Sequence, residues 1–127
     1  MDIDKTIHIL IAEDDTPNRQ LLLNILTTTG FSNVVEAENG KIAWDLLNSK
    51  KFDLLLTDWM MPEMDGLDLL KKIRKSSGEL KHLPVMMITA LGKSDDILKA
   101  AQWDINGYIV KPYSVNTILA KIANVLK

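Results

Sequence analysis

Five runs of apolar residues divide the chain at regular intervals. Continuous runs occupy residues 7–12, 54–57, 85–90 and 108–110, and a weaker run occupies residues 34–37. The runs lack the apolar–polar alternation of a strand with one solvated face. They therefore predict strands that are buried on both faces, as in a parallel sheet covered by helices.

The segments between these runs have the period of an amphipathic helix. Apolar residues three or four positions apart share one helical face in three segments: Leu22, Ile25 and Leu26; Leu69, Leu70 and Ile73; and Ile118, Leu119, Ile122 and Leu126. Gly30 is placed to end the first helix, Pro84 precedes the fourth strand, and Ser114 can cap the last helix. The alternation predicts an α/β fold, a doubly wound five-stranded parallel sheet with helices on both faces.

Composition limits the range of functions. At 127 residues, 46% of them hydrophobic and without linker or low-complexity tract, the chain is expected to form one domain over residues 1–127. With 15 basic and 17 acidic residues there is no broad basic field, so nucleic acid is not an expected partner. The absence of cysteine excludes disulfides and thiolate metal sites, and we expect a cytoplasmic location. The first apolar run is too short for a signal sequence or a membrane span.

Acidic residues follow two of the predicted strands. Glu13, Asp14 and Asp15 come after the first strand, and Asp58 comes after the third. In doubly wound sheets the ligand site lies at the carboxyl ends of the strands, where these carboxylates would converge if the two strands are neighbours. Converging carboxylates need a cation, and a hard ion such as Mg²⁺ prefers oxygen ligands. The alternative is that they are helix caps and solvated charges, and Asp15 suits a cap before Pro17.

Two further strand ends carry groups that suit a phosphate. Lys111 follows the fifth run, and Thr89 ends the fourth. An ammonium group can stabilise charge on a transferring phosphoryl group, and a hydroxyl can donate a hydrogen bond to a phosphoryl oxygen. Each residue alone is more commonly a solvated lysine or an ordinary strand threonine. Four strand ends that each offer a suitable group favour a phosphate site.

Four segments resemble the motifs of response-regulator receiver domains, in particular chemotaxis-type single-domain regulators. They are residues 9–15 (ILIAEDD), 55–66 (LLTDWMMPEMDG), 85–90 (VMMITA) and 107–113 (GYIVKPY). Their order and spacing span nearly the whole chain, which makes the resemblance specific. It implies the flavodoxin-like strand order 2-1-3-4-5.

The resemblance also implies a metal site and an acceptor. Asp58 corresponds to the phosphoacceptor of the family. Asp14 corresponds to a direct ligand of Mg²⁺ or Mn²⁺, Glu13 to a ligand through water, and the backbone carbonyl of Met60 to a further ligand. Glu13 stands where aspartate is commoner in the family, but its longer side chain should still reach the metal through water.

A second group of residues corresponds to the phosphate-sensing part of the family site. Lys111 would contact the phosphoryl group, and Thr89 resembles the switch hydroxyl. Tyr108 resembles the aromatic side chain that turns inward when that hydroxyl moves, and Ala90 leaves the approach to the acceptor open. In such families the peptide corresponding to Lys111–Pro112 is often cis.

The function that the resemblance implies is a phosphorylation-dependent switch of a two-component system. A histidine kinase or histidine phosphotransfer protein would donate the phosphoryl group. A surface formed by the fourth helix, fifth strand and fifth helix would then bind a downstream target. The chain would be a monomer and no enzyme beyond catalysing its own phosphorylation and slow self-dephosphorylation. Since it stops after the fifth helix, we expect a stand-alone regulator; a receiver excised from a hybrid kinase or longer regulator, and a degenerate receiver that binds partners without phosphate, are the alternatives.

Slow self-dephosphorylation is expected from two apolar residues. Met60 and Leu91 stand at positions that in this family influence how fast the phosphate is hydrolysed, and neither carries a polar group that could position water. For the other loop residues, we expect Met60, Met61 and Met64 to pack in the loop rather than form a cofactor site. Trp59 could be partly buried or exposed beside the site.

Two rival enzyme classes lack essential residues. Gly92-Lys93-Ser94 resembles the end of a P-loop, but the required earlier glycine is replaced by Met87 within an apolar run. Phosphatases of the haloacid dehalogenase kind carry a second aspartate two residues after the nucleophile, where this chain has Met60. Turnover of external substrates is therefore not expected.

Overall fold

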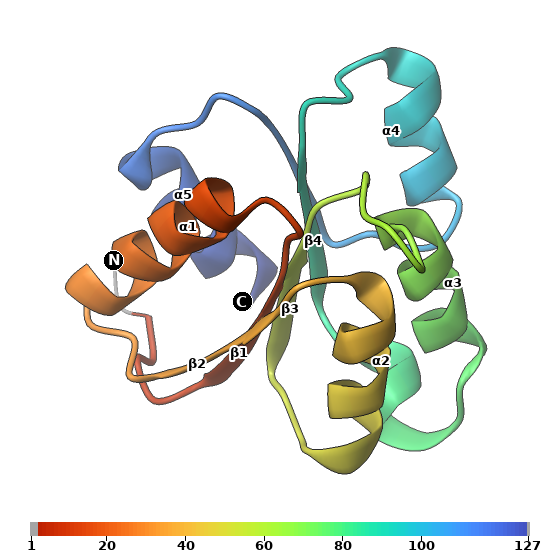
Figure 1. Cartoon of the computed structure of the whole chain (residues 1–127), viewed down its shortest axis with the longest axis horizontal. Helices are drawn as coiled ribbons and strands as arrows, with labels where there is room; N and C mark the ends of the chain where they lie inside the picture. The colour runs from red at the N-terminus through yellow and green to blue at the C-terminus, as the bar shows by residue number, and fades with distance from the viewer. Residues whose placement is uncertain (1–2, 127) are drawn as a thin grey trace.

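The computed structural model describes residues 3–126, and one parallel sheet runs through their centre (Figure 1). Its strands are β1 (His8–Ala12), β2 (Asn33–Ala37), β3 (Leu54–Thr57), β4 (Val85–Thr89) and β5 (Gly107–Val110). Their order across the sheet is β2-β1-β3-β4-β5, with every neighbouring pair parallel. The predicted fold class and strand order are both confirmed, and the predicted strand bounds differ by no more than one residue.

Helices cover both faces of this sheet. They are α1 (Thr16–Thr28), α2 (Gly40–Ser49), α3 (Gly66–Lys75), α4 (Ser94–Ala101) and α5 (Val115–Val125), with a short 3₁₀ helix, η1 (Gly78–His82), before β4. In Figure 1, α1 and α5 lie on one side of the strands, and α2, α3 and α4 lie on the other. The 3₁₀ helix was not predicted, because its sequence carries no apolar period.

The core explains why the strand runs are continuously apolar. Along β1, Ile9 and Ile11 pack in the cluster shared with α1 and α5, whereas Leu10 and Ala12 pack in the cluster shared with α2 and α3. Successive strand residues point to opposite faces, so a strand covered on both faces needs apolar residues at every position. The edge strand β2 is only partly buried, and this accounts for its weaker apolar signal.

The boundary residues act as predicted from the sequence. Asp15 caps α1, since its Oδ2 accepts a hydrogen bond from the amide of Asn18 at 3.1 Å. Ser114 caps α5 through the amide of Thr117 at 3.1 Å. Gly30 follows α1 with a φ of 110°, a left-handed conformation that favours glycine.

Candidate functional site

The register of the sheet brings Glu13 and Asp58 together at its carboxyl edge. β1 pairs with β3 so that Ala12 lies opposite Thr57, and the next residue of each strand begins a loop. The amide of Asp58 donates to the carbonyl of Ala12 at 2.9 Å. The two carboxylates therefore start from adjacent points of the backbone, as the sequence predicted for neighbouring strands.

Lys111 reaches these carboxylates from the end of β5. Its Nζ donates to Glu13 Oε1 at 2.7 Å and to Asp58 Oδ2 at 2.8 Å. The three side chains are largely buried, with exposed fractions of 21% for Lys111, 6% for Glu13 and 12% for Asp58. The lysine thus places one positive charge between two carboxylates that would otherwise repel each other.

The electrostatics of this cluster follow from burial. Burial raises the pKa of Glu13, and the charge of Asp58 adds to this, while the hydrogen bond from Lys111 acts against it. Burial by itself would lower the pKa of Lys111, but hydrogen bonds and charges from Asp58 and Glu13 raise it above its ordinary value. The ammonium group therefore stays charged at neutral pH. The other oxygen of Asp58, Oδ1, accepts from the amide of Trp59 at 2.6 Å.

Asp14 and Met60 are exposed and lie outside this buried cluster. Asp14 is exposed beside Glu13. Met60 is 63% exposed, so the prediction that Met60 packs within the loop is wrong. Met61 and Met64 do pack against the core, as predicted.

The donor set fits a Mg²⁺ ion that keeps several waters. Within residues 3–126, no three carboxylate or imidazole side chains lie close enough together to hold a metal ion by themselves. Mg²⁺ usually binds through one or two carboxylates and retains water in the remaining positions. Glu13 and Asp58 converge on the ammonium group of Lys111, Asp14 follows Glu13 in the chain, and backbone carbonyl oxygens of the loop are of the right chemical type.

Thr89 and Tyr108 both bind the backbone of the same residue, Leu91. The fully buried hydroxyl of Thr89 accepts from the amide of Leu91 at 3.3 Å, and the hydroxyl of Tyr108 donates to the carbonyl of Leu91 at 2.6 Å. The carbonyl of Thr89 in turn accepts from the amide of Lys111 at 2.8 Å. The two residues predicted to act as a switch are therefore linked to each other and to the lysine.

Burial and nearby negative charge affect the phenol of Tyr108. Burial, followed by the charges of Asp96 and Asp58, raises its pKa to about 12. The phenol therefore remains protonated, and able to donate to Leu91, at any physiological pH. The charge of Asp58 is thus one of the causes of the raised pKa of Tyr108, although the hydroxyl itself binds Leu91.

The loop after β3 depends on a close approach that sequence reasoning missed. A Cβ atom on Gly66 would lie 2.1 Å from the carbonyl oxygen of Asp58, and the amide of Gly66 donates to the carbonyl of Trp59 at 2.7 Å. Trp59 is buried against Met87 and Ala100, which decides between the two positions considered for it. Gly66, at the end of the motif over residues 55–66, was the available signal, but the close contact needs the folded loop.

Two further features of the site region agree with what the resemblance implied. The Lys111–Pro112 peptide is cis, as the resemblance implied. Ala90, directly after β4, is exposed at the carboxyl edge, in agreement with an open approach there.

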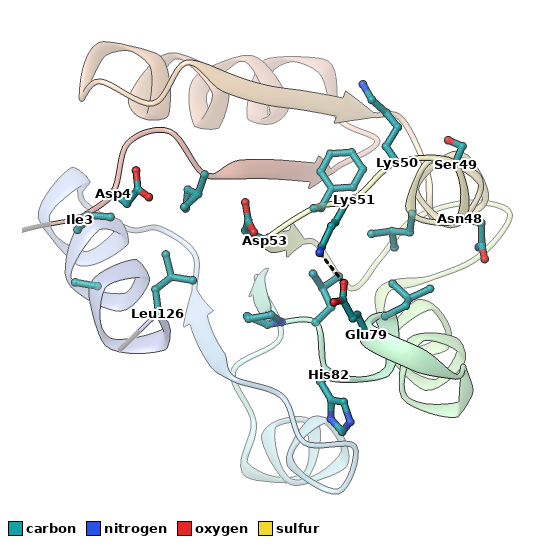
Figure 2. Close-up of a pocket in the computed structure, with 17 residues that line it drawn as sticks. Ile3, Asp4, Asn48, Ser49, Lys50, Lys51, Asp53, Glu79, His82 and Leu126 are labelled. Carbon is teal, nitrogen blue, oxygen red and sulfur yellow. Dashed lines mark ion pairs between the residues drawn. The ribbon is translucent and has the colours of Figure 1, made fainter.

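A cavity lies at the opposite edge of the sheet (Figure 2). Its volume is about 1000 Å³, and residues that precede β1, β3 and β4 line it, such as Ile7, Asp53 and Pro84. The ion pair of Lys51 and Glu79, with Nζ and Oε2 2.7 Å apart, lies among the lining side chains. The cavity is therefore separate from the acidic cluster, none of whose residues lines it.

Comparison with known proteins identifies the family. The model of the response regulator receiver domain matches residues 9–123. The chemotaxis protein CheY-3 of Vibrio cholerae is 45% identical over 125 residues, which cover 98% of this chain and 95% of the relative. The chemotaxis protein CheY of Pseudomonas aeruginosa is 44% identical over 119 residues, covering 94% of this chain and 95% of the relative.

Solved structures agree with the fold. The chemotaxis protein CheY4 of Vibrio cholerae, crystallised at low pH, superposes with a TM-score of 0.88 at 26% identity, covering 95% of this chain and 99% of that one. The signal receiver domain of a histidine kinase from Syntrophus aciditrophicus superposes with a TM-score of 0.85 at 28% identity, covering 95% of this chain and 90% of that one.

Several general properties follow from these matches. Receiver domains generally bind Mg²⁺ at their acidic pocket, and CheY-like receivers interact with histidine kinases and downstream targets. They are signalling domains rather than classical enzymes. No helix among residues 3–126 is long and apolar enough to cross a membrane. The chain belongs to the response regulator receiver domain family and is a CheY-like receiver of phosphorylation-dependent two-component signalling.

Proposed function

We propose that Asp58 is the residue that accepts the phosphoryl group, and that residues 1–127 act as one phosphoacceptor unit. The observation that carries this proposal is the position of Asp58 beside the ammonium group of Lys111, with its side chain more exposed than that of Glu13. An acceptor must be reached by the donor, and the cation must lie beside it. Asp15 is already bound as the cap of α1, and Asp14 is exposed outside the lysine contact.

The transfer follows from these groups. A carboxylate oxygen of Asp58 attacks the phosphorus of a phosphohistidine in line, an O–P bond forms, and the P–N bond to the donor imidazole breaks. The imidazole takes a proton from solvent, and the product is an acyl phosphate. Lys111, already within 2.8 Å of the acceptor, offsets negative charge on the phosphoryl oxygens.

The residues assigned to the metal are Glu13, Asp14, Asp58 and the carbonyl of Met60. Mg²⁺ or Mn²⁺ held there supplies additional positive charge to the phosphoryl oxygens. The oxygen-only donor set and the partly buried, paired carboxylates support this assignment.

Phosphorylation would change the hydrogen bonds of the switch residues. The acyl phosphate adds negative charge near Lys111, and it offers oxygens that can accept from the hydroxyl of Thr89. If that hydroxyl turns to the phosphate, the amide of Leu91 loses its present partner, and Tyr108 is bound to the carbonyl of the same residue. The loop after β4 and the ring of Tyr108 would therefore rearrange together.

The output surface that we propose is formed by α4, β5 and α5. Exposed apolar side chains occur on each of these elements, namely Ile97, Leu98, Val110 and Val115. Such side chains can contribute the apolar centre of a transient interface with a target protein. Tyr108 lies in β5 and Leu91 just before α4, so a change at the switch residues reaches this surface directly.

The phosphate is proposed to be lost slowly. Met60 and Leu91 flank the site in sequence and offer only apolar side chains, which cannot orient an attacking water molecule. A half-life of only seconds, measured after removal of the donor, would contradict this part of the proposal.

Labelling by a phosphodonor tests the acceptor. The parent protein is incubated with a phosphorylated histidine kinase and Mg²⁺, in parallel with Asp58→Asn. We expect label on the parent and none on the variant. Equal labelling of both proteins would show that the acceptor is another residue.

A further inference from the structure

Every polar atom of Glu13 takes part in a hydrogen bond. Its amide donates to the carbonyl of Ala37 at 3.1 Å, and its carbonyl accepts from Nη1 of Arg19 at 2.9 Å. Its carboxylate accepts from Lys111 through Oε1 at 2.7 Å and from the amide of Asp15 through Oε2 at 3.3 Å. Ala37 ends β2, Asp15 lies in the loop before α1, and Lys111 follows β5, whereas Arg19 belongs to α1.

Arg19 is more than a surface charge. Its side chain is 13% exposed, and Nε donates to Oε1 of Glu36 at 3.3 Å. Glu36 lies in β2, opposite Ile11 of β1, so one guanidinium group joins α1 to β2 and to the start of the loop. The planar group can make both contacts at once, which the single ammonium of a lysine does less well.

The contact with the carbonyl of Glu13 sets the orientation of a peptide plane. That carbonyl and the amide of Asp14 belong to the same rigid peptide unit. Fixing the carbonyl therefore limits the directions in which the chain can leave toward Asp14, whose side chain is exposed. The residue after Asp14 is also fixed, because Asp15 caps α1 and its carbonyl accepts a hydrogen bond from the amide of Arg19 at 2.9 Å.

We infer that Arg19 is a positioning residue, which raises the affinity of the site for a divalent cation by fixing the peptide between Glu13 and Asp14. The inference rests on the proposed function, because it takes both residues as metal ligands. Arg19 does not itself contact the carboxylates, and it carries a positive charge that repels a metal ion. Positioning and charge therefore act in opposite directions, so the sign of the effect separates them.

Calorimetric titration with Mg²⁺ tests the inference on the full chain. Mutation of a residue that orients metal ligands typically lowers metal affinity by about 10- to 100-fold. We therefore expect Arg19→Gln to weaken Mg²⁺ binding by about 10-fold. Arg19→Lys should fall between the parent and Arg19→Gln, because an ammonium group can still donate to the carbonyl. Unchanged or tighter binding by Arg19→Gln would overturn the inference, since loss of a repelling charge alone would strengthen binding.

Glu36→Gln is the matched control. It removes the ion pair but leaves Arg19 able to donate to the carbonyl of Glu13, so Mg²⁺ affinity should stay within about 2-fold of the parent, as for other exposed pairs. A loss equal to that of Arg19→Gln would overturn the inference, because the effect would then come from joining α1 to β2. If Arg19→Gln does not fold, as judged by circular dichroism, Arg19→Lys decides between the same outcomes.

The rate of phosphorylation supplies a second readout. With a small-molecule phosphodonor, Arg19→Gln should need about 10-fold more Mg²⁺ but reach the parent rate at saturation. If Arg19→Gln is phosphorylated more slowly at saturating Mg²⁺ but needs no more Mg²⁺ than the parent, the substitution has caused a general structural defect, and the inference is overturned. A parent that neither binds Mg²⁺ nor takes label would overturn the proposed function as well, whereas a normal parent with a normal Arg19→Gln overturns this inference alone.

Discussion

The two edges of the sheet each hold a lysine–carboxylate pair of the same length, but in different surroundings. At the carboxyl edge, Lys111 and Glu13 are 2.7 Å apart and largely buried. At the amino edge, Lys51 and Glu79 are also 2.7 Å apart, with side chains that are 77% and 79% exposed. The pair at the amino edge lines a cavity of about 1000 Å³, and the pair at the carboxyl edge does not line that cavity.

This difference shows that neither pair length nor cavity size identifies the site. Exposed ion pairs contribute little, because water screens them and both side chains lose freedom, while buried charges depend strongly on their partners. The phosphoryl group that a receiver must hold is small. Its transfer requires charged groups close to one carboxylate rather than a large cavity. Burial and convergence at Asp58 are therefore the informative features.

The largest expected effect compares the two aspartates on either side of β3, Asp58 after it and Asp53 before it. Asp58→Asn should abolish phosphoryl labelling, because the amide is a poor nucleophile and weakens the metal site. Asp53→Asn, at the amino edge, removes a carboxylate that accepts from the amide of His8 at 2.8 Å, and it should label like the parent. Labelling by a histidine kinase measures both. Loss of label in Asp53→Asn would remove the distinction between the edges.

A second comparison removes the lysine from each pair. Lys111→Ala leaves Glu13 buried without its cation, which should lower the free energy of unfolding by about 3 kcal/mol. It should also slow phosphorylation. Lys51→Ala should leave the denaturation midpoint unchanged, because that pair is exposed. Urea denaturation measures both variants, and equal destabilisation would mean that burial is not what separates the pairs.

A third comparison adds a methyl group near each edge. In Gly66→Ala the new Cβ would lie 2.1 Å from the carbonyl oxygen of Asp58, and the forced shift should cost about 2 kcal/mol and slow labelling. In Gly78→Ala no atom lies within 4 Å of the new Cβ, but the φ of 70° is unfavourable for alanine. This substitution should lower the free energy of unfolding by about 1 kcal/mol without affecting labelling. Thermal unfolding and labelling rates measure the pair. A normal labelling rate in Gly66→Ala would contradict the close packing of the Asp58 loop.

The smallest effect concerns the pH dependence of the two tyrosines, Tyr108 and Tyr113. Burial raises the pKa of Tyr113, and the pKa of Tyr108 is raised to about 12. The phenol of an unfolded tyrosine has a pKa of about 10, so the neutral phenols contribute their full stabilisation of the fold below that pH. The contribution is lost as the pH rises toward 12.

Near-ultraviolet phenolate absorbance follows this titration. The folded protein should show little phenolate where free tyrosine is half ionised, and Tyr108→Phe should remove the step at the highest pH. Half-ionisation of both residues at the ordinary tyrosine pKa would contradict the buried position of Tyr108. It would also weaken the proposed coupling between Tyr108 and Leu91.

The local sequence determined the elements and the chemistry they carry. Burial on both faces forces continuous apolar residues such as Leu54 to Leu56, so the strands can be recognised directly. Capping requires particular side chains at particular positions, and Asp15 and Ser114 could be identified for that reason. The acidic residues and Lys111 were found because they follow such strands, and Thr89 because it ends one.

Tertiary structure alone decided how these groups are paired. Lys111 meets Glu13 from 98 residues away, a contact set by strand order and register rather than by any local pattern. The link from Arg19 to Glu13 and Glu36, and the close approach of Gly66 to Asp58, likewise depend on how a helix and two loops settle against the sheet. Burial of a charge is a property of the packed chain, because its free energy depends on neighbours that are distant in sequence.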